Sequence, residues 1–215
     1  MQKGSPSIDK EFITSKDAYC VSWETMDSES GILKSEVSIC PSINANNCLL
    51  RNMDVGNRTI ICTADLEFQE GVQYKTKIRS TNIVGLASEL SSDGFVVDST
   101  PPVIGDITHL ENPPLEESSQ FTSSEISVKW NGFLDKESVV RNYYLCIGTQ
   151  SGGCNVMNFT NVGTSSSYSW LDAQLVQGET YFVSIKAENR AGLVSDVKSS
   201  TGVAVDKTGT FVNDF

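Results

Sequence analysis

The stretch GVQYKTKIRSTNIVGLAS (residues 71–88) decides the fold of this chain, because a second version of it follows. The second version, GETYFVSIKAENRAGLVS (residues 178–195), repeats its Gly, Tyr, Ile, Asn, Gly, Leu and Ser at an offset of 107. Trp23 and Trp130 keep the same offset. A repeat of about 100 residues is long enough to close a hydrophobic core of its own. The sequence therefore predicts two similar domains in series.

Short segments of strand character recur along both copies. The segments 74–80 and 181–187 alternate apolar and polar residues, so one side of each should be buried while lysines 75, 77 and 186 face water. Turn residues separate these segments, and a sustained helical period is missing from the sequence. This pattern predicts an all-β protein made of two sandwiches.

Composition limits the kinds of partner. The 39% hydrophobic and 20% charged content is typical of a folded chain and not of a disordered one. The apolar runs fall short of the roughly 20 residues that span a bilayer. A formal net charge of −11 argues against binding to nucleic acid or to an anionic membrane, because phosphates select for Lys and Arg.

The repeated residues resemble the fibronectin type III family. The resemblance rests on a Trp late in an early strand, followed by Gly-x-x-Tyr-x-x-x-Ile-x-x-x-Asn-x-x-Gly-Leu-x-Ser near the end of each copy, and it covers both copies. It implies an immunoglobulin-like β-sandwich in which the Trp packs centrally. It also implies that Tyr74 and Tyr181 begin strand F and brace the preceding turn. The family serves adhesion molecules, receptors, enzymes and matrix proteins, so the resemblance predicts the fold more than the function.

Six cysteines depart from the usual pattern of that family, whose members typically lack disulfides. Two pairs enclose seven residues each and bracket a turn of a hairpin, and the remaining two both lie in the first domain. Free thiols or a zinc site are the alternatives, but zinc is disfavoured because the chain has a single histidine, His109. We expect three disulfides in an oxidising compartment, namely Cys20–Cys62, Cys40–Cys48 and Cys146–Cys154.

Two sequons agree with an extracellular location. Asn57-Arg-Thr and Asn158-Phe-Thr both match the acceptor motif for N-glycosylation. We therefore expect glycans at Asn57 and Asn158 and a secreted or cell-surface protein.

The joint between the copies sets the domain boundaries. We expect a first domain at 1–98, a second at 99–206 and a linker at about 98–103 that Pro101 and Pro102 make semi-rigid. The segment 206–214 repeats features of 98–106, so residues 207–215 are predicted to begin a further repeat of a longer protein.

Acidic residues near the joint are the metal candidates. Asp98, Asp135 and Glu137 offer the hard oxygen ligands that calcium prefers, and a calcium ion at the linker would stiffen the array. The alternative is that the Asp residues cap turns and the Glu faces solvent. A different cofactor is not expected.

The sequence predicts a binding role and no catalysis. A single histidine and paired cysteines leave little for a nucleophile, and catalytic residues are not expected. Two aromatic residues, Tyr144 and Trp170, lack a counterpart in the other copy and either anchor a partner or fill the core. We expect a non-catalytic extracellular adhesion or structural module that binds proteins or neighbouring repeats. The alternatives are a receptor ectodomain that binds a ligand and an accessory module of a secreted enzyme.

Overall fold

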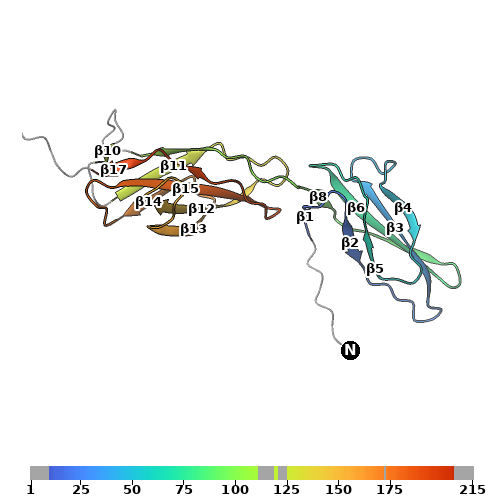
Figure 1. The fold of residues 1–215 in the computed structure, drawn as a ribbon. Coiled ribbons are helices and arrows are strands. Elements are labelled where there is room, and N and C mark those ends of the chain that lie inside the picture. Colours follow the sequence, from blue (N-terminus) through green and yellow to red (C-terminus); the bar gives the residue numbers. More distant parts are fainter. Residues whose placement is uncertain (1–9, 111–118, 121–124, 172, 206–215) are drawn as a thin grey trace, which may run out of the picture. The chain divides into compact units, whose positions relative to one another are not determined.

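The computed structural model describes residues 10–110, 119–120, 125–171 and 173–205, and the segment 206–215 lies outside this range. In the part of the chain that it describes, all regular secondary structure is strand, in agreement with the predicted all-β class (Figure 1). Two compact units form. The first contains the residues up to Thr100 together with Lys136–Ser138, and the second contains Pro101–Asp135 and the residues after Ser138.

The first unit packs a six-stranded sheet against a two-stranded one. The large sheet has the order β1-β8-β6-β3-β4, with β7 paired to β6, and the small sheet pairs β2 with β5 (Figure 1). The strands are β1 (Phe12–Ile13), β2 (Tyr19–Ser22), β3 (Ile32–Pro41), β4 (Leu50–Asp54), β5 (Ile60–Thr63), β6 (Gln73–Asn82), β7 (Ala87–Ser91) and β8 (Phe95–Val97).

The second unit repeats this plan with one strand more in its small sheet. The large sheet has the order β10-β17-β15-β12-β13, with β16 paired to β15, and the small sheet has the order β14-β11-β9. The strands are β9 (Asp106–His109), β10 (Ser119–Gln120), β11 (Glu125–Asn131), β12 (Val140–Gly148), β13 (Met157–Gly163), β14 (Ser167–Leu171), β15 (Thr180–Asn189), β16 (Lys198–Ser199) and β17 (Val203–Val205).

The alternation predicted for the repeated stretch is present in β6. Its burial alternates strictly from Gln73 to Asn82, with Tyr74, Thr76 and Ile78 inside and Lys75 and Lys77 exposed. In β15, Tyr181, Val183 and Ile185 face the core in the same way. Because the side-chain period of a strand is two, burial of one face fixes the register of the whole strand.

Each unit has its own hydrophobic core. Trp23 and Trp130 are 9% and 3% exposed and belong to the cores of the first and second unit, as the resemblance implies. The tyrosine hydroxyls act as the resemblance implies as well. Tyr74 accepts a hydrogen bond from the backbone N–H of Gln69 at 3.0 Å, and Tyr181 accepts one from Val176 at 3.0 Å.

The repeated Asn and Gly shape one turn in both units. Asn82 Oδ1 accepts a hydrogen bond from Leu86 N at 2.8 Å, and Asn189 Oδ1 accepts one from Leu193 N at 2.8 Å. The glycine inside each turn has a φ of +87° at Gly85 and +85° at Gly192, a conformation that costs glycine no steric strain. The Asn-x-x-Gly-Leu motif is therefore a turn signature.

Candidate binding surface

The outward face of the large sheet in the second unit is the candidate binding surface. It is formed where β13, β12 and β15 lie side by side. Tyr143 packs against the hydrophobic core, so the next residue along β12, Tyr144, projects from the opposite, outward face. Tyr144 lies directly across from Lys186 of β15.

Lys186 holds two aromatic rings of this face together. Its Nζ lies 4.4 Å from the ring centroid of Phe159 on β13 and 5.7 Å from that of Tyr144 on β12. Both distances are within the range of cation–π attraction. The predicted exposure of Lys186 is thus modified, because its side chain is half-buried against the two rings.

Glu188 completes the face next to these rings. It accepts a hydrogen bond from Tyr144 Oη at 2.6 Å and one from Asn142 Nδ2 at 3.2 Å. The bond from the Tyr144 hydroxyl is the main cause that lowers the pKa of Glu188, with Asn142 and Arg141 adding to it. The same hydrogen bond raises the pKa of Tyr144. The carboxylate and the hydroxyl are therefore fixed in one orientation, which preorganises this part of the surface. We refer to Tyr144, Phe159, Lys186 and Glu188 as the aromatic face.

The equivalent face of the first unit is ionic. Glu36 of β3 lies across from Arg79 of β6, where the second unit has Tyr144 and Lys186. Glu89 forms ion pairs with Lys77 at 2.5 Å and with Arg79 at 4.0 Å. The Lys77 hydrogen bond is the main cause that lowers the pKa of Glu89. The two units thus share a scaffold but differ in the chemistry of this surface.

The cysteines lie where the sequence places them. The structure joins Cys20 to Cys62, Cys40 to Cys48 and Cys146 to Cys154, and all six cysteines are paired. The second and third disulfides close the hairpins β3–β4 and β12–β13, so Cys146–Cys154 borders the aromatic face. The first disulfide joins directly opposite residues of β2 and β5.

Serines replace the first disulfide in the second unit. Ser127 of β11 and Ser169 of β14 are directly opposite, as Cys20 and Cys62 are, and their hydroxyl oxygens lie 2.6 Å apart. The small polar pair thus spans the same two strands with a hydrogen bond in place of a covalent bond.

Two of the acidic loop residues hold the repeated asparagines. Asp27 Oδ2 accepts a hydrogen bond from Asn82 Nδ2 at 3.0 Å, and Asp135 Oδ2 accepts one from Asn189 Nδ2 at 3.0 Å. Asp27 also accepts hydrogen bonds from the backbone N–H groups of Glu29, Ser30 and Gly31. Such bonds are the loop-capping role that the alternative to calcium requires.

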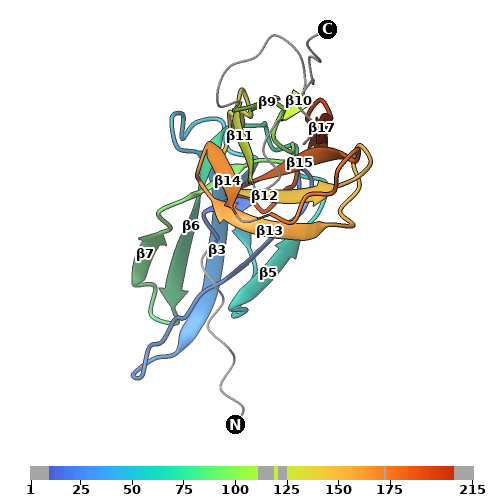
Figure 2. The same cartoon turned by 90° about the vertical axis from the view of Figure 1, so that its left-hand side faces the viewer.

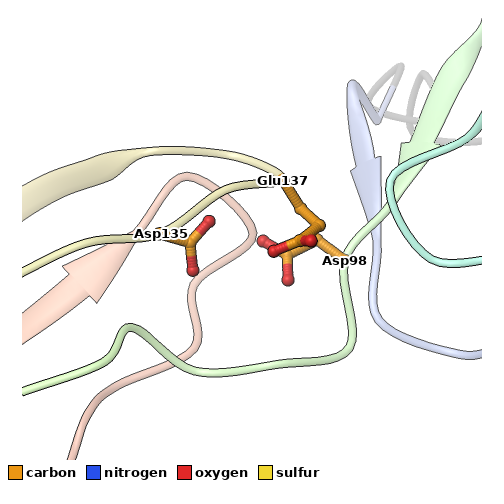
Figure 3. A group of neighbouring side chains, drawn as sticks. All are labelled: Asp98, Asp135 and Glu137. Carbon is orange, nitrogen blue, oxygen red and sulfur yellow. The ribbon is translucent and has the colours of Figure 1, made fainter.

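Figure 3 shows the side chains of the three calcium candidates, Asp98, Asp135 and Glu137. Asp98 is fully buried after β8 and accepts a hydrogen bond from Thr100 N at 3.1 Å. Asp135 and Glu137 lie in the loop between β11 and β12. Asp98 and Glu137 belong to the first unit and Asp135 to the second, and calcium binding by these residues stays a prediction. A difference in melting temperature between saturating calcium and a chelator would test it.

Two further predictions concern single residues. Asn57 and Asn158 are both exposed, in the turn before β5 and on β13, and their glycosylation stays a prediction. Trp170 packs against the core of the second unit, which is the core-filling role weighed for it. Tyr144, by contrast, belongs to the outward face.

Sequence reasoning missed Phe159 and Glu188, although the alternation of β15 places Glu188 on the same side as Lys186.

Both units have the strand order of the fibronectin type III fold, as the sequence predicts. Comparison with family models gave no match, and no curated protein matches the sequence. Among solved structures, the chicken CNTN1 FN1–FN3 domains align with a TM-score of 0.47 and 18% identity over 93% of this chain and 66% of that one. Fibronectin(III)-like modules of CbhA from Clostridium thermocellum align with a TM-score of 0.46 and 13% identity over 98% of this chain and 97% of that one.

Proposed function

We propose that this chain is part of a non-catalytic extracellular adhesion or structural protein, and that the aromatic face of its second unit binds a protein partner. Three disulfides support an oxidising, extracellular compartment. The fold itself leaves function open, so the proposal rests on the chemistry of the surface. In the part of the chain that the structure describes, no helix is long and apolar enough to cross a bilayer.

The aromatic face is the observation that carries this proposal. Tyrosine is enriched among the residues that dominate binding energy, because it buries a large ring and still satisfies a polar group. Tyr144 has its hydroxyl fixed by Glu188, and Phe159 has its ring held by Lys186. A partner that covers this face would bury two ordered rings at a small cost in side-chain entropy.

A charged partner surface is not required for this mode of binding. Lys186 and Glu188 carry opposite charges next to each other on β15, and each is bonded to an aromatic residue of the face. Their charges therefore orient the rings more than they create a strong local field. We infer a partner that presents an apolar centre with a polar rim, as is usual for protein–protein interfaces.

A cell-attachment assay tests the proposal. Wells are coated with the oxidised two-domain protein, and cells of the organism that encodes this protein are allowed to attach. We expect a double variant, Tyr144→Ala with Phe159→Ala, to reduce attachment severalfold. The matched control is Glu36→Ala with Arg79→Ala on the equivalent face of the first unit, which should leave attachment unchanged. Attachment no higher than in albumin-coated wells, or equal loss in both double variants, would contradict the proposal.

A further inference from the structure

Strand β7 of the first unit is an open and regular sheet edge (Figure 2). Among the described strands it pairs with β6 alone, all five of its residues are exposed, and its register with β6 contains no shift. The other edge of the sheet, β4, has a register shift, and Asn52 there has a φ of +49°. Bulges of this kind protect sheet edges from pairing with other chains. β7 lacks such protection.

The same strand is interrupted in the second unit. Its counterpart pairs with β15 through an isolated bridge at Val194 and through the two residues of β16. Between them, Ser195 turns its hydroxyl to the backbone N–H of Ala187 at 2.9 Å. Lys198 of β16 forms an ion pair with Asp106 of β9 at 3.1 Å. In the second unit this edge strand is therefore interrupted, and its β16 segment is held to β9 by an ion pair. In the first unit the same strand is regular.

The hydrogen-bonding groups of β7 point in alternate directions. Asn82 N donates to Leu86 O at 2.9 Å, and Ser92 N donates to Thr76 O at 2.9 Å. In an antiparallel ladder, residues alternate between facing the partner strand and facing away from it. The backbone groups of Leu86, Ser88 and Leu90 therefore face β6, and those of Ala87, Glu89 and Ser91 point outward.

Two large apolar side chains accompany this edge. Leu86 is 71% exposed and Leu90 is 66% exposed. They are separated by four positions with Ser88 between them, so all three side chains project from one side of the strand. Glu89 projects from the other side, where it is paired with Lys77.

We propose that β7 pairs antiparallel with β7 of a second copy of this chain, around a two-fold axis at Ser88. In this register Ala87 of one copy faces Glu89 of the other, and the outward backbone groups of both residues meet. Leu86 of each copy then lies opposite Leu90 of the other. These are non-hydrogen-bonded pairs, in which side chains approach most closely, so four exposed leucines are buried together.

Charge selects this register over its neighbours. An axis at Glu89 would place two carboxylates directly opposite each other, which is unfavourable. An axis at Ala87 avoids this contact but pairs Leu86 with Ser88 and leaves Leu90 without Leu86. The axis at Ser88 places each Glu89 opposite an alanine and leaves its bond to Lys77 intact. The interface is isologous, as is usual for homodimers.

Net charge gives the dimer a characteristic dependence on salt. Each chain has a formal net charge of −11, so two copies repel each other at long range, and salt screens this repulsion. The proposed contact is apolar and is not itself weakened by screening. Dimerisation therefore strengthens as ionic strength rises, whereas docking through opposite charges would weaken.

This dimer is independent of the proposed function, because none of its residues belongs to the aromatic face. The double variant Tyr144→Ala with Phe159→Ala should leave dimerisation unchanged, and loss of dimerisation need not affect attachment to a heterologous partner. The two proposals can therefore fail separately.

Sedimentation velocity on the whole oxidised chain tests the association. We expect a concentration-dependent dimer between about 10 µM and about 1 mM. Leu90→Lys should weaken it by about tenfold or more, because two buried leucines are lost in each dimer. Val197→Lys, at the equivalent position of the second unit and 44% exposed, is the matched control and should have no effect. A monomer at every concentration, or equal effects of both variants, would overturn the proposal.

Cysteine cross-linking tests the register. In the proposed dimer the two Ser88 residues are directly opposite, at a Cα separation of about 4.5 Å that a disulfide can bridge. Ser88→Cys should give a covalent dimer under mild oxidation, with the bond located by peptide mapping. Ser91→Cys, equally exposed but opposite Gly85 of the other copy, should remain monomeric. Equal cross-linking of both variants, or of neither, would rule out this register.

Discussion

A single asparagine in each unit joins three parts of the fold. Asn82 donates through Nδ2 to Asp27 in the β2–β3 loop and accepts through Oδ1 from Leu86 in the β6–β7 turn. Asn189 makes the same two bonds with Asp135 and Leu193. An aspartate in its place would repel the loop carboxylate, and an alanine would remove both hydrogen bonds at once. The repetition of this residue is therefore explained by the scaffold.

The Asp27 carboxylate gives the first unit a measurable pH dependence. Hydrogen bonds from Ser30 N, then from Asn82, lower its pKa from 3.8 to about 2. Because the pKa in the folded state is below that of the unfolded state, the stabilisation is present above pH 3.8 and is lost as the pH falls toward 2. We expect the difference in melting temperature between the native protein and Asp27→Asn to shrink over that interval.

The control for this experiment is Glu24→Gln, which changes an exposed carboxyl on the same loop. The difference in melting temperature between the native protein and Glu24→Gln should not shrink in the same way over this pH interval. A carbon-detected NMR titration of the native protein gives the pKa of Asp27 directly. An Asp27 titration near pH 4, or a difference between the proteins that stays constant with pH, would refute the assignment.

The tyrosine hydroxyls allow a matched test in both units. Tyr74→Phe and Tyr181→Phe each leave a backbone N–H without its acceptor, at Gln69 and at Val176. We expect each substitution to lower the free energy of unfolding by about 1 kcal/mol, the usual net value of one such hydrogen bond. Urea denaturation measures this change. Tyr168→Phe removes a hydroxyl that is 4.0 Å from Met157 Sδ and should cost much less. An equal loss would show that the bond to the backbone N–H is not the cause of the destabilisation.

At the scale of elements, the two units differ at one pair of equivalent positions, where the first unit has a disulfide and the second has two serines. Cys20 and Cys62 are 42 residues apart and directly opposite on β2 and β5, and Ser127 and Ser169 occupy the same register on β11 and β14. Ser127→Cys with Ser169→Cys should therefore form a disulfide without backbone movement. We expect about 3 kcal/mol of added stability from the constraint on the unfolded chain, measured by non-reducing denaturation.

The reverse exchange serves as the control. Cys20→Ser with Cys62→Ser should destabilise the first unit by a similar amount while the Ser–Ser contact preserves the fold. Free thiols at positions 127 and 169 after oxidation would show that the strands of the second unit do not accept the bond. A stabilisation below about 1 kcal/mol would show that strain cancels the entropic gain.

The elements also show what the sequence can and cannot predict. Strands β6 and β15 could be predicted from the sequence because one face of each is buried, so the alternation of residues alone assigns each side chain to a face. The two hairpin disulfides could be predicted because each cysteine pair encloses seven residues around a turn, and Cys20–Cys62 could be predicted as the remaining pair of the first domain. The position of Phe159 on the outward face could not be predicted from the sequence. Met157 packs against the core, and strict alternation would put Phe159 beside it.

The register of β12 with β13 explains this failure. It shifts between Leu145 and Ile147, so the strand departs from a period of two, and Phe159 reaches Lys186 on the outward face. A bulge of one residue moves every later side chain to the other side of the sheet. The aromatic face depends on this irregularity, and a residue pattern carries no signal for it. The open edge at β7 is similar, because exposure of Leu90 depends on which strands lie nearby.

At the scale of the whole molecule, each unit contains one exposed sequon. Asn57 lies in the turn between β4 and β5, and Asn158 lies on β13, which is an edge strand of its sheet. Exposed acceptors on turns and edge strands are accessible to the glycosylation machinery after as well as during folding. Together with three disulfides, they predict that the chain is made in the secretory pathway.

Material secreted from a eukaryotic host should therefore carry two N-glycans. Glycosidase treatment should lower its mass in two steps, and Asn57→Gln and Asn158→Gln should each remove one step. Asn161→Gln changes an exposed asparagine of the same strand that is not in a sequon, so its mass shift should equal that of the native protein. A mass unaffected by glycosidase would refute the glycosylation. Asn158 directly precedes Phe159, so cell attachment of the Asn158→Gln variant also shows whether a glycan at this site limits access to the aromatic face. Unchanged attachment is expected if the partner reaches the two rings from the side of β12 and β15.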